Sequence, residues 1–334
     1  MQYLPSKKNQ FLSVLFKASL IAATVSILSP STASASGFYT VKKEYNLDFE
    51  KKANGEKITN STAGNSLGIG NQWQDWGVKI SANSKDKPNS SEPLVLFKSN
   101  STSFTGGDND LRTGTTWGTE EQGNVLIIQE DGWQTNASGK ITGVKNADDP
   151  DDEANGGWIT FDFFNAPVNL TGFSLLDMDD DQDSRGKFLE IFAWDKSGNE
   201  FKVDALSLIK GHKETHLKRN NGTYKPNSQG EGKSYTNTNA VVTNGQPQNQ
   251  KSVTITQESS ARGDNSLYSF STEGFDDIVK LQYRYPGSGA IASVKWNKEE
   301  KRKVPEPGGA LGFIIIASIF IRNVCQGKSS TSDC

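Results

Sequence analysis

The densest group of side chains that could do chemistry is an acidic stretch in the middle of the chain, in which aspartates alternate with other residues. Its carboxylates belong to Asp177, Asp179, Asp181, Asp183 and, at the twelfth position counted from Asp179, Glu190. This spacing is typical of a calcium loop, because the ion takes about six to eight hard oxygen ligands. Ser184 stands where an EF-hand loop has glycine, which excludes an EF-hand. The sequence predicts a calcium site of another kind, in a loop between strands; a solvated acidic turn is the alternative.

A second group of residues could bind sugar. Asp108 and Asp110 lie in a Gly-Gly-Asp-Asn-Asp loop, and Trp117 and Trp133 follow in polar surroundings. Aromatic rings can pack on the apolar face of a sugar, and carboxylates accept hydrogen bonds from its hydroxyls. We therefore expect these four residues to form a weak polysaccharide site in loops at the ends of the sheets. The other tryptophans are expected to fill the core.

Catalytic constellations are poorly supported. His212 and His216 are the only histidines, and with Glu214 between them they match neither common zinc-protease pattern. The two cysteines lie near the C-terminus, so the body of the chain offers no thiol nucleophile. The strand around Glu190 lacks the paired acids of laminarinase-type jelly rolls, because Phe192 occupies the middle acidic position. We expect no enzymatic activity; a glycan-active hydrolase or lyase on a jelly-roll scaffold is the alternative.

Short strands must position these residues. Polar and apolar residues alternate in residues 45–49, 76–80 and 158–164, whereas 94–97 and 125–128 are continuous apolar runs, typical of strands covered on both faces. Further strands are expected at residues 175–176, 188–194, 253–255, 279–285 and 291–296. Gly, Asn, Asp and Ser stand at the junctions, and no amphipathic helix of a dozen residues is evident. The pattern predicts an all-β, antiparallel β-sandwich or jelly roll with long acidic and polar loops, closed by a hairpin at residues 285–291.

The N-terminus has the order of a secretory signal peptide. Three lysines precede or open an apolar stretch at residues 18–28, and Ala33-Ser34-Ala35 follows as a small-residue exit. We expect cleavage after Ala35. Removing residues 1–35, which carry three lysines and no acid, changes the formal net charge from −3 to −6. An acidic protein argues against nucleic acid as a partner, since such binding needs clustered Lys and Arg.

The C-terminus carries Val304, then Pro305, Glu306 and Pro307, an apolar stretch at residues 308–321, and Arg322. This order resembles the PEP-CTERM sorting tail. The resemblance implies processing by an exosortase-type sorting enzyme, contact with the membrane through the tail before processing, and delivery to the envelope, outer surface or extracellular matrix of a Gram-negative-type bacterium or cyanobacterium. A plain C-terminal membrane anchor is the alternative.

Four segments between residues 97 and 183 carry a second resemblance: Gly-Gly-Asp-x-Asp-Leu, Asn-Val-Leu-Ile-Ile-Gln-Glu, Asp-Asp-Glu-Ala-Asn-Gly-Gly and Leu-Leu-Asp-x-Asp. Their succession resembles an uncharacterised β-domain that recurs in PEP-CTERM proteins, and it implies no activity. The expected organisation is a signal peptide at 1–35, a β-sandwich at 36–298 with a long polar excursion at 211–265, a charged linker at 299–303 and the sorting tail at 304–334.

These features favour an exported structural or adhesive protein of the envelope or of an extracellular, biofilm-type matrix. Extracellular polysaccharide is the expected ligand, bound weakly and with the help of calcium.

Overall fold

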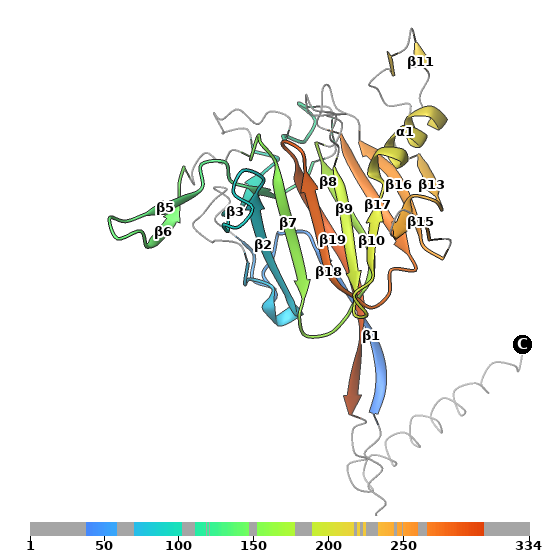
Figure 1. Ribbon diagram of the computed structural model, residues 1–334, viewed down its shortest axis with the longest axis horizontal. Helices are drawn as coiled ribbons and strands as arrows, with labels where there is room; N and C mark the ends of the chain where they lie inside the picture. Colours follow the sequence, from blue (N-terminus) through green and yellow to red (C-terminus); the bar gives the residue numbers. More distant parts are fainter. Residues whose placement is uncertain are drawn as a thin grey trace, which may run out of the picture. The chain divides into compact units, whose positions relative to one another are not determined.

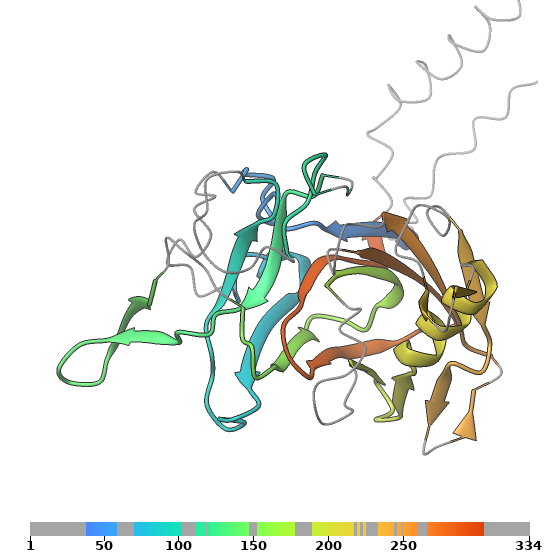
Figure 2. The same ribbon diagram turned by 90° about the horizontal axis from the view of Figure 1, so that it is seen from above.

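The structure is a computed structural model that describes residues 38–58, 70–101, 111–117, 119, 121–146, 152–177, 189–216, 219–220, 223–224, 233–243, 246–248, 250–259 and 266–303. These residues form two antiparallel β-sheets that pack face to face (Figures 1 and 2). The predicted all-β sandwich is confirmed. The segments predicted to be a signal peptide and a sorting tail, and residues 178–188, lie outside the described residues.

One sheet has seven strands and carries the candidate site. Its order is β15 (Gln246–Pro247), β14 (Val241–Thr243), β10 (Glu200–Val203), β9 (Glu190–Asp195), β18 (Ile278–Tyr285), β7 (Gly157–Phe163) and β2 (Val78–Ser84). Alternate residues of these strands face the core, as Ile191 and Ala193 do in β9.

The other sheet has eight strands. Its order is β13 (Ser234–Asn237), β16 (Ser252–Ser259), β17 (Leu267–Glu273), β8 (Asn169–Leu176), β19 (Ala290–Lys303), β4 (Asn124–Ile128) and β3 (Leu94–Lys98), and β1 (Phe38–Leu47) also pairs with β19. Two further sheets have two strands each: β5 (Trp133–Thr135) pairs with β6 (Ile141–Val144), and β11 (Arg219–Asn220) pairs with β12 (Thr223–Tyr224). Residues 299–303, expected as a linker, continue β19.

Aromatic side chains join the two sheets. Phe173 of β8 stacks on Phe270 of β17 with 4.8 Å between ring centres, and its ring meets the edge of Tyr283 of β18 at 5.4 Å. Trp296 of β19 stacks on Tyr45 of β1 in its own sheet and meets Phe163 of β7 in the other sheet edge to face, each with 5.3 Å between ring centres. Because burying such rings removes large apolar areas from water, this core stabilises the sandwich.

The strands β3 and β4 are buried on both faces, which confirms the prediction from their continuous apolar runs. Leu96 and Leu126 face the main core between the sheets. Phe97 and Val125 face a second hydrophobic cluster, which includes Leu111 from a loop.

The described residues contain a helix where none was expected. The helix α1 (Ala205–His216) begins where Asp204 Oδ1 accepts a hydrogen bond of 3.0 Å from the Ser207 backbone N–H. Its buried stripe is Ala205, Leu208, Ile209 and His212, a helical spacing that ends in a histidine rather than an aliphatic residue. A short 3-10 helix, η1 (Gln74–Trp76), precedes β2. No helix among the described ranges is long and apolar enough to cross a membrane.

The predicted closing hairpin is wrong. The turn after Tyr285 leads from β18 in one sheet to β19 in the other, so the two strands are successive in sequence without pairing. Val241, Val253 and Ile255, which lie in the segment expected as a polar excursion, are buried in the main core.

Candidate functional site

The predicted calcium residues are only partly covered by the described residues. Asp177 directly follows β8 in a left-handed conformation (φ 58°) and is buried, whereas Asp179, Asp181 and Asp183 lie outside the described residues. Glu190 opens β9 and forms an ion pair with Lys202 of β10. Within the described residues, no group of three or more His, Cys, Asp or Glu is placed to hold a metal ion. The calcium site stays a prediction.

Asp152 and Asp177, from the two acidic segments, both lie against Gly289 at one end of the sandwich. Asp152 Oδ2 accepts a hydrogen bond of 2.6 Å from the backbone N–H of Gly289. The position of a Cβ on Gly289 would lie 3.4 Å from the backbone oxygen of Asp177. Burial, followed by the charges of Asp177 and Asp152, raises the pKa of the Tyr285 phenol well above its usual value. Two buried carboxylates and a neutral phenol therefore share this end.

The predicted sugar-binding residues have structural partners. Trp117 is half-buried, with the Arg112 guanidinium 5.6 Å from its ring centre. The Trp133 indole N–H donates a hydrogen bond of 2.7 Å to the Ser91 carbonyl, and the ring packs against the second hydrophobic cluster. Asp108 and Asp110 lie outside the described residues. The role of these four residues in sugar binding stays a prediction.

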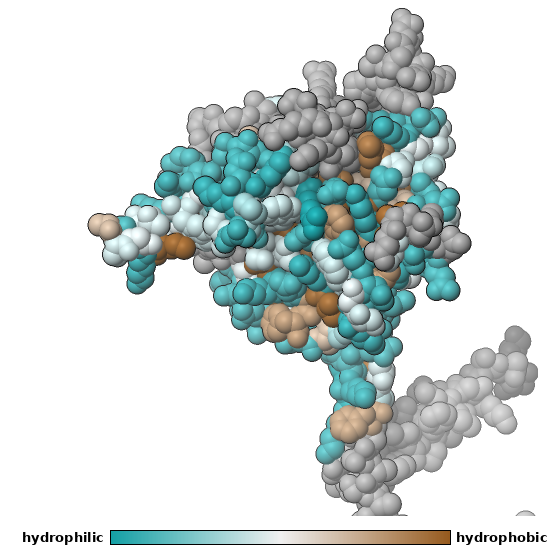
Figure 3. Space-filling model, in the orientation of Figure 1, coloured by the Kyte–Doolittle hydropathy of each residue, from teal (hydrophilic) through white to brown (hydrophobic). Residues whose placement is uncertain are grey.

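The richest arrangement of polar and aromatic side chains is the outer face of the seven-stranded sheet, called here the outer face. Strand register sets its residues in three rows across the sheet: Asn83, Trp158, Arg284 and Glu190; Ser81, Thr160, Gln282, Phe192 and Lys202; and Lys79, Asp162, Lys280, Trp194 and Glu200. Figure 3 shows mainly hydrophilic residues on the side of the molecule that carries this face. Residues directly opposite one another have Cβ atoms about 5 Å apart, so each row forms a continuous surface.

Arg284 is held in place by its neighbours. Its guanidinium carbon lies 4.0 Å from the ring centre of Phe192. Its Nε donates a hydrogen bond of 2.7 Å to Gln282 Oε1, and Gln282 Nε2 donates one of 2.9 Å to Thr160 Oγ1. Stacking and this hydrogen-bonded chain limit the rotamers of a long side chain, which lowers the entropy that a ligand would have to remove.

Aromatic rings extend from Arg284 along β9. Phe192 and Trp194 stack with 5.8 Å between ring centres, and Lys280 Nζ lies 4.6 Å from the centre of the Trp194 ring. Phe192 is buried although it faces outward, because Arg284 and Lys202 also pack on it. Trp194 and Trp158 are half-buried and keep part of their surface accessible.

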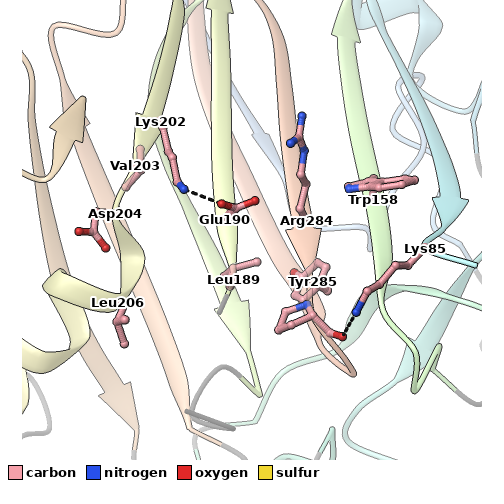
Figure 4. A pocket seen from close by; sticks show the side chains of 11 residues that line it. Lys85, Trp158, Leu189, Glu190, Lys202, Val203, Asp204, Leu206, Arg284 and Tyr285 are labelled. Atoms are coloured by element: carbon pink, nitrogen blue, oxygen red, sulfur yellow. Dashed lines mark hydrogen bonds and ion pairs between the residues drawn. The ribbon is translucent and has the colours of Figure 1, made fainter. Parts of the chain in front are cut away.

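A cavity of about 530 Å³ occupies one end of the outer face (Figure 4). Its lining combines Trp158, Glu190, Lys202 and Arg284 of the rows with Lys85, Leu189, Val203, Asp204, Leu206, Tyr285 and Pro286. Arg284 stands between Glu190 and Trp158 in this view, and Lys85 Nζ donates a hydrogen bond of 3.4 Å to the Pro286 carbonyl. The cavity offers an indole surface beside cationic donors, a combination suited to binding a polar ring-shaped ligand.

The outer face was not among the sites predicted from the sequence. The alternation in residues 158–164 and 279–285 indicates which residues face away from the core. Phe192 and Trp194, two residues apart, could have indicated that this outward face carries aromatic rings. The pairing of β18 with both β7 and β9 brings the residues of the outer face together. The sequence of a single strand does not determine this register.

Comparison with known family models, with curated proteins and with solved structures finds no match. The function is therefore inferred from the chemistry of the outer face.

Proposed function

We propose that this protein is an exported, non-enzymatic matrix protein that binds extracellular polysaccharide through the outer face. The observation that carries the proposal is the set of rows in which the partly accessible Trp158 and Trp194 stand beside amide, hydroxyl and cationic side chains. Sugar rings stack on exposed aromatic surface, and their hydroxyls exchange hydrogen bonds with polar neighbours. An open face buries little of each sugar, so the affinity for a single sugar is low and a polymer gains by multiple contacts.

The proposed address comes from the two ends of the chain. The predicted signal peptide ending at Ala35 and the predicted tail beginning at Val304 resemble those of exported PEP-CTERM proteins. Delivery to the envelope or matrix of a Gram-negative-type bacterium or cyanobacterium would place the outer face among exopolysaccharides. Calcium at the acidic loop of residues 177–183 would order one end of the sandwich.

Affinity electrophoresis in gels that contain the host exopolysaccharide tests the proposal. The wild-type protein should migrate more slowly than in a plain gel, and Trp158→Ala and Trp194→Ala should each reduce the retardation. Phe164→Ala is the matched control, because Phe164 is an exposed aromatic residue (54% exposed) just beyond β7 and outside the three rows. Full retardation in both tryptophan variants would reject the outer face as the site.

The alternative function, a glycan hydrolase or lyase, is favoured by one observation: Glu190 and Asp204 both line the cavity. Both carboxylates also have structural partners, since Glu190 pairs with Lys202 and Asp204 caps α1. Measurement of reducing ends and of unsaturated sugar products after incubation with host exopolysaccharide separates the two functions. Release of either product by wild type, and its loss in Glu190→Gln, would establish the enzyme.

A further inference from the structure

We infer that the polysaccharide bound by the outer face is anionic, and that a carboxylate-bearing sugar occupies the cavity between Trp158 and Arg284. This inference rests on the proposed function and specifies its ligand class. Three observations support it: the unused donors of Arg284, its position beside Trp158, and a second aromatic and cationic pair whose cation lies on the same strand as Arg284.

Arg284 keeps most of its hydrogen-bonding capacity. Of the five N–H bonds of a guanidinium, the Nε–H is used by Gln282. Arg284 forms no ion pair with any residue in the described part of the chain, because the ion pair at this end of the face joins Glu190 to Lys202 instead. A fixed, planar guanidinium with its two terminal nitrogens available matches a carboxylate in a bidentate manner.

Trp158 is the cross-strand neighbour of Arg284. The two residues are directly opposite in the antiparallel pairing of β7 with β18, and both line the cavity. A sugar ring that stacks on the indole would therefore hold a ring carboxylate within reach of the guanidinium. Neutral sugar would use the indole and leave the guanidinium without an anionic partner.

A second aromatic and cationic pair repeats this chemistry farther along the sheet. Trp194 of β9 is directly opposite Lys280 of β18, and the Lys280 ammonium lies over the indole at 4.6 Å. Lys280 and Arg284 are four residues apart on one strand, or about 13 Å at the usual rise per residue. Two cationic and aromatic pairs at that spacing suit a polymer that presents repeated carboxylates, and Lys280 likewise has no ion pair within the described ranges.

The acids of the face are largely countered by its own cations. Asp162 lies in register between Lys79 and Lys280, and Glu190 is paired with Lys202. With Glu200, which lies opposite Trp194, the three rows hold four cations and three acids. The net formal charge of the chain is −3. An anionic polymer would thus meet its cationic partners on this face in a protein that is otherwise acidic.

The test compares two polymers with one backbone: polygalacturonate and its fully methyl-esterified form, in which the carboxylates are neutral. Retention of the full-length protein, in mild detergent and with EDTA, is measured by affinity electrophoresis in gels containing either polymer. Wild type should bind polygalacturonate at least about tenfold more tightly than the ester, and the difference should shrink as salt is raised. Arg284→Gln should lose about tenfold of the affinity for polygalacturonate and little for the ester.

Two further variants make the result specific. Glu190→Gln removes an acid beside Arg284 and should strengthen binding to polygalacturonate. Lys196→Gln removes a lysine that pairs with Asp277 outside the three rows and should change nothing. Equal binding of wild type to both polymers, or equal losses for both in Arg284→Gln, would overturn the anionic ligand while leaving polysaccharide binding intact. If neither polymer nor host exopolysaccharide retards the protein, the proposed function fails as well.

Discussion

The phenol of Tyr45 donates a hydrogen bond of 2.8 Å to the carboxylate of Glu300 and so connects β1 to β19. Glu300 also lies 3.6 Å from Lys43, 3.9 Å from Lys298 and 3.8 Å from Arg302. The hydrogen bond from Tyr45, followed by the charges of the three cations, lowers the pKa of this carboxyl. One acid thus organises the polar contacts of the first and last strands.

The lowered pKa of Glu300 predicts an acid-sensitive contribution to stability. The contribution is fully present above the unfolded pKa of about 4.3 and is lost as the pH falls through the lower folded value. Glu300→Gln should therefore lower the melting temperature by about 1 to 3 °C at pH 7, and the gap to wild type should close near pH 3. Differential scanning calorimetry from pH 3 to 7 measures this. A gap that stays constant with pH would contradict the assignment.

Phe173 is expected to be a main contributor to the core. It is 1% exposed and contacts both Phe270 and Tyr283. Phe173→Ala should lower the free energy of unfolding by about 3 to 5 kcal/mol, because the lost apolar contacts leave a cavity between the sheets. Phe164→Ala, at an exposed aromatic residue, should change it by less than about 0.5 kcal/mol. Urea denaturation of both variants tests the difference, and similar losses would contradict it.

Two glycines allow the free-energy cost of a steric clash to be distinguished from the cost of a left-handed backbone conformation. Gly156 has φ 77°, and a Cβ there would lie 2.3 Å from the backbone oxygen of Tyr285. Gly198 has φ 83°, with nothing within 4 Å of the same position. Gly198→Ala should therefore cost only the left-handed conformation, about 1 to 2 kcal/mol, whereas Gly156→Ala should cost clearly more. Equal unfolding midpoints in urea for the two variants would show that the backbone near Gly156 moves aside.

Calcium is predicted to stabilise the protein. At a hundredfold excess over its dissociation constant, an ion bound only by the folded state adds about 2.7 kcal/mol to the free energy of unfolding. Thermal melts with calcium and with chelator should differ for wild type and coincide for Asp181→Ala. Glu190→Gln then shows whether Glu190, which pairs with Lys202, belongs to the site. Coincident wild-type melts would reject a structural calcium site.

The resemblance of the C-terminus to a sorting tail predicts its removal in a host that has an exosortase. Intact-mass analysis of the exported protein should find no residues beyond the region of Pro305, Glu306 and Pro307. Replacement of Glu306 by Ala should leave the tail attached and keep the protein in the membrane fraction. Exported wild-type protein with Cys334 still attached would instead establish a plain anchor.

The fold was largely predictable because buried strands have recognisable patterns of apolar residues in the sequence. Phe97 and Val125 sit in continuous apolar runs, and both strands are covered on two sides. The helix α1 was missed because its buried stripe ends in His212, and because Gly211, which weakens helices, leaves room for the ring of Tyr235.

The candidate site was less predictable, for a physical reason. Trp158, Arg284 and Glu190 are far apart in sequence and become neighbours only through the pairing of three strands. Trp117 and Trp133 were predicted to bind sugar because their sequence neighbours are polar. The indole of Trp133 nevertheless packs on a hydrophobic cluster. Composition identifies residues that can bind sugar, whereas strand register determines which of them act together.

The positions of β18 and β19 have a consequence for how the chain reaches its native state. These last two strands lie in the middle of their sheets, β18 between β7 and β9 and β19 between β8 and β4. Until residues 278–303 have been synthesised, each sheet is divided into separate groups of strands that share no hydrogen-bonded neighbour. The pairing that joins these groups into two complete sheets is thus delayed until both strands have been synthesised.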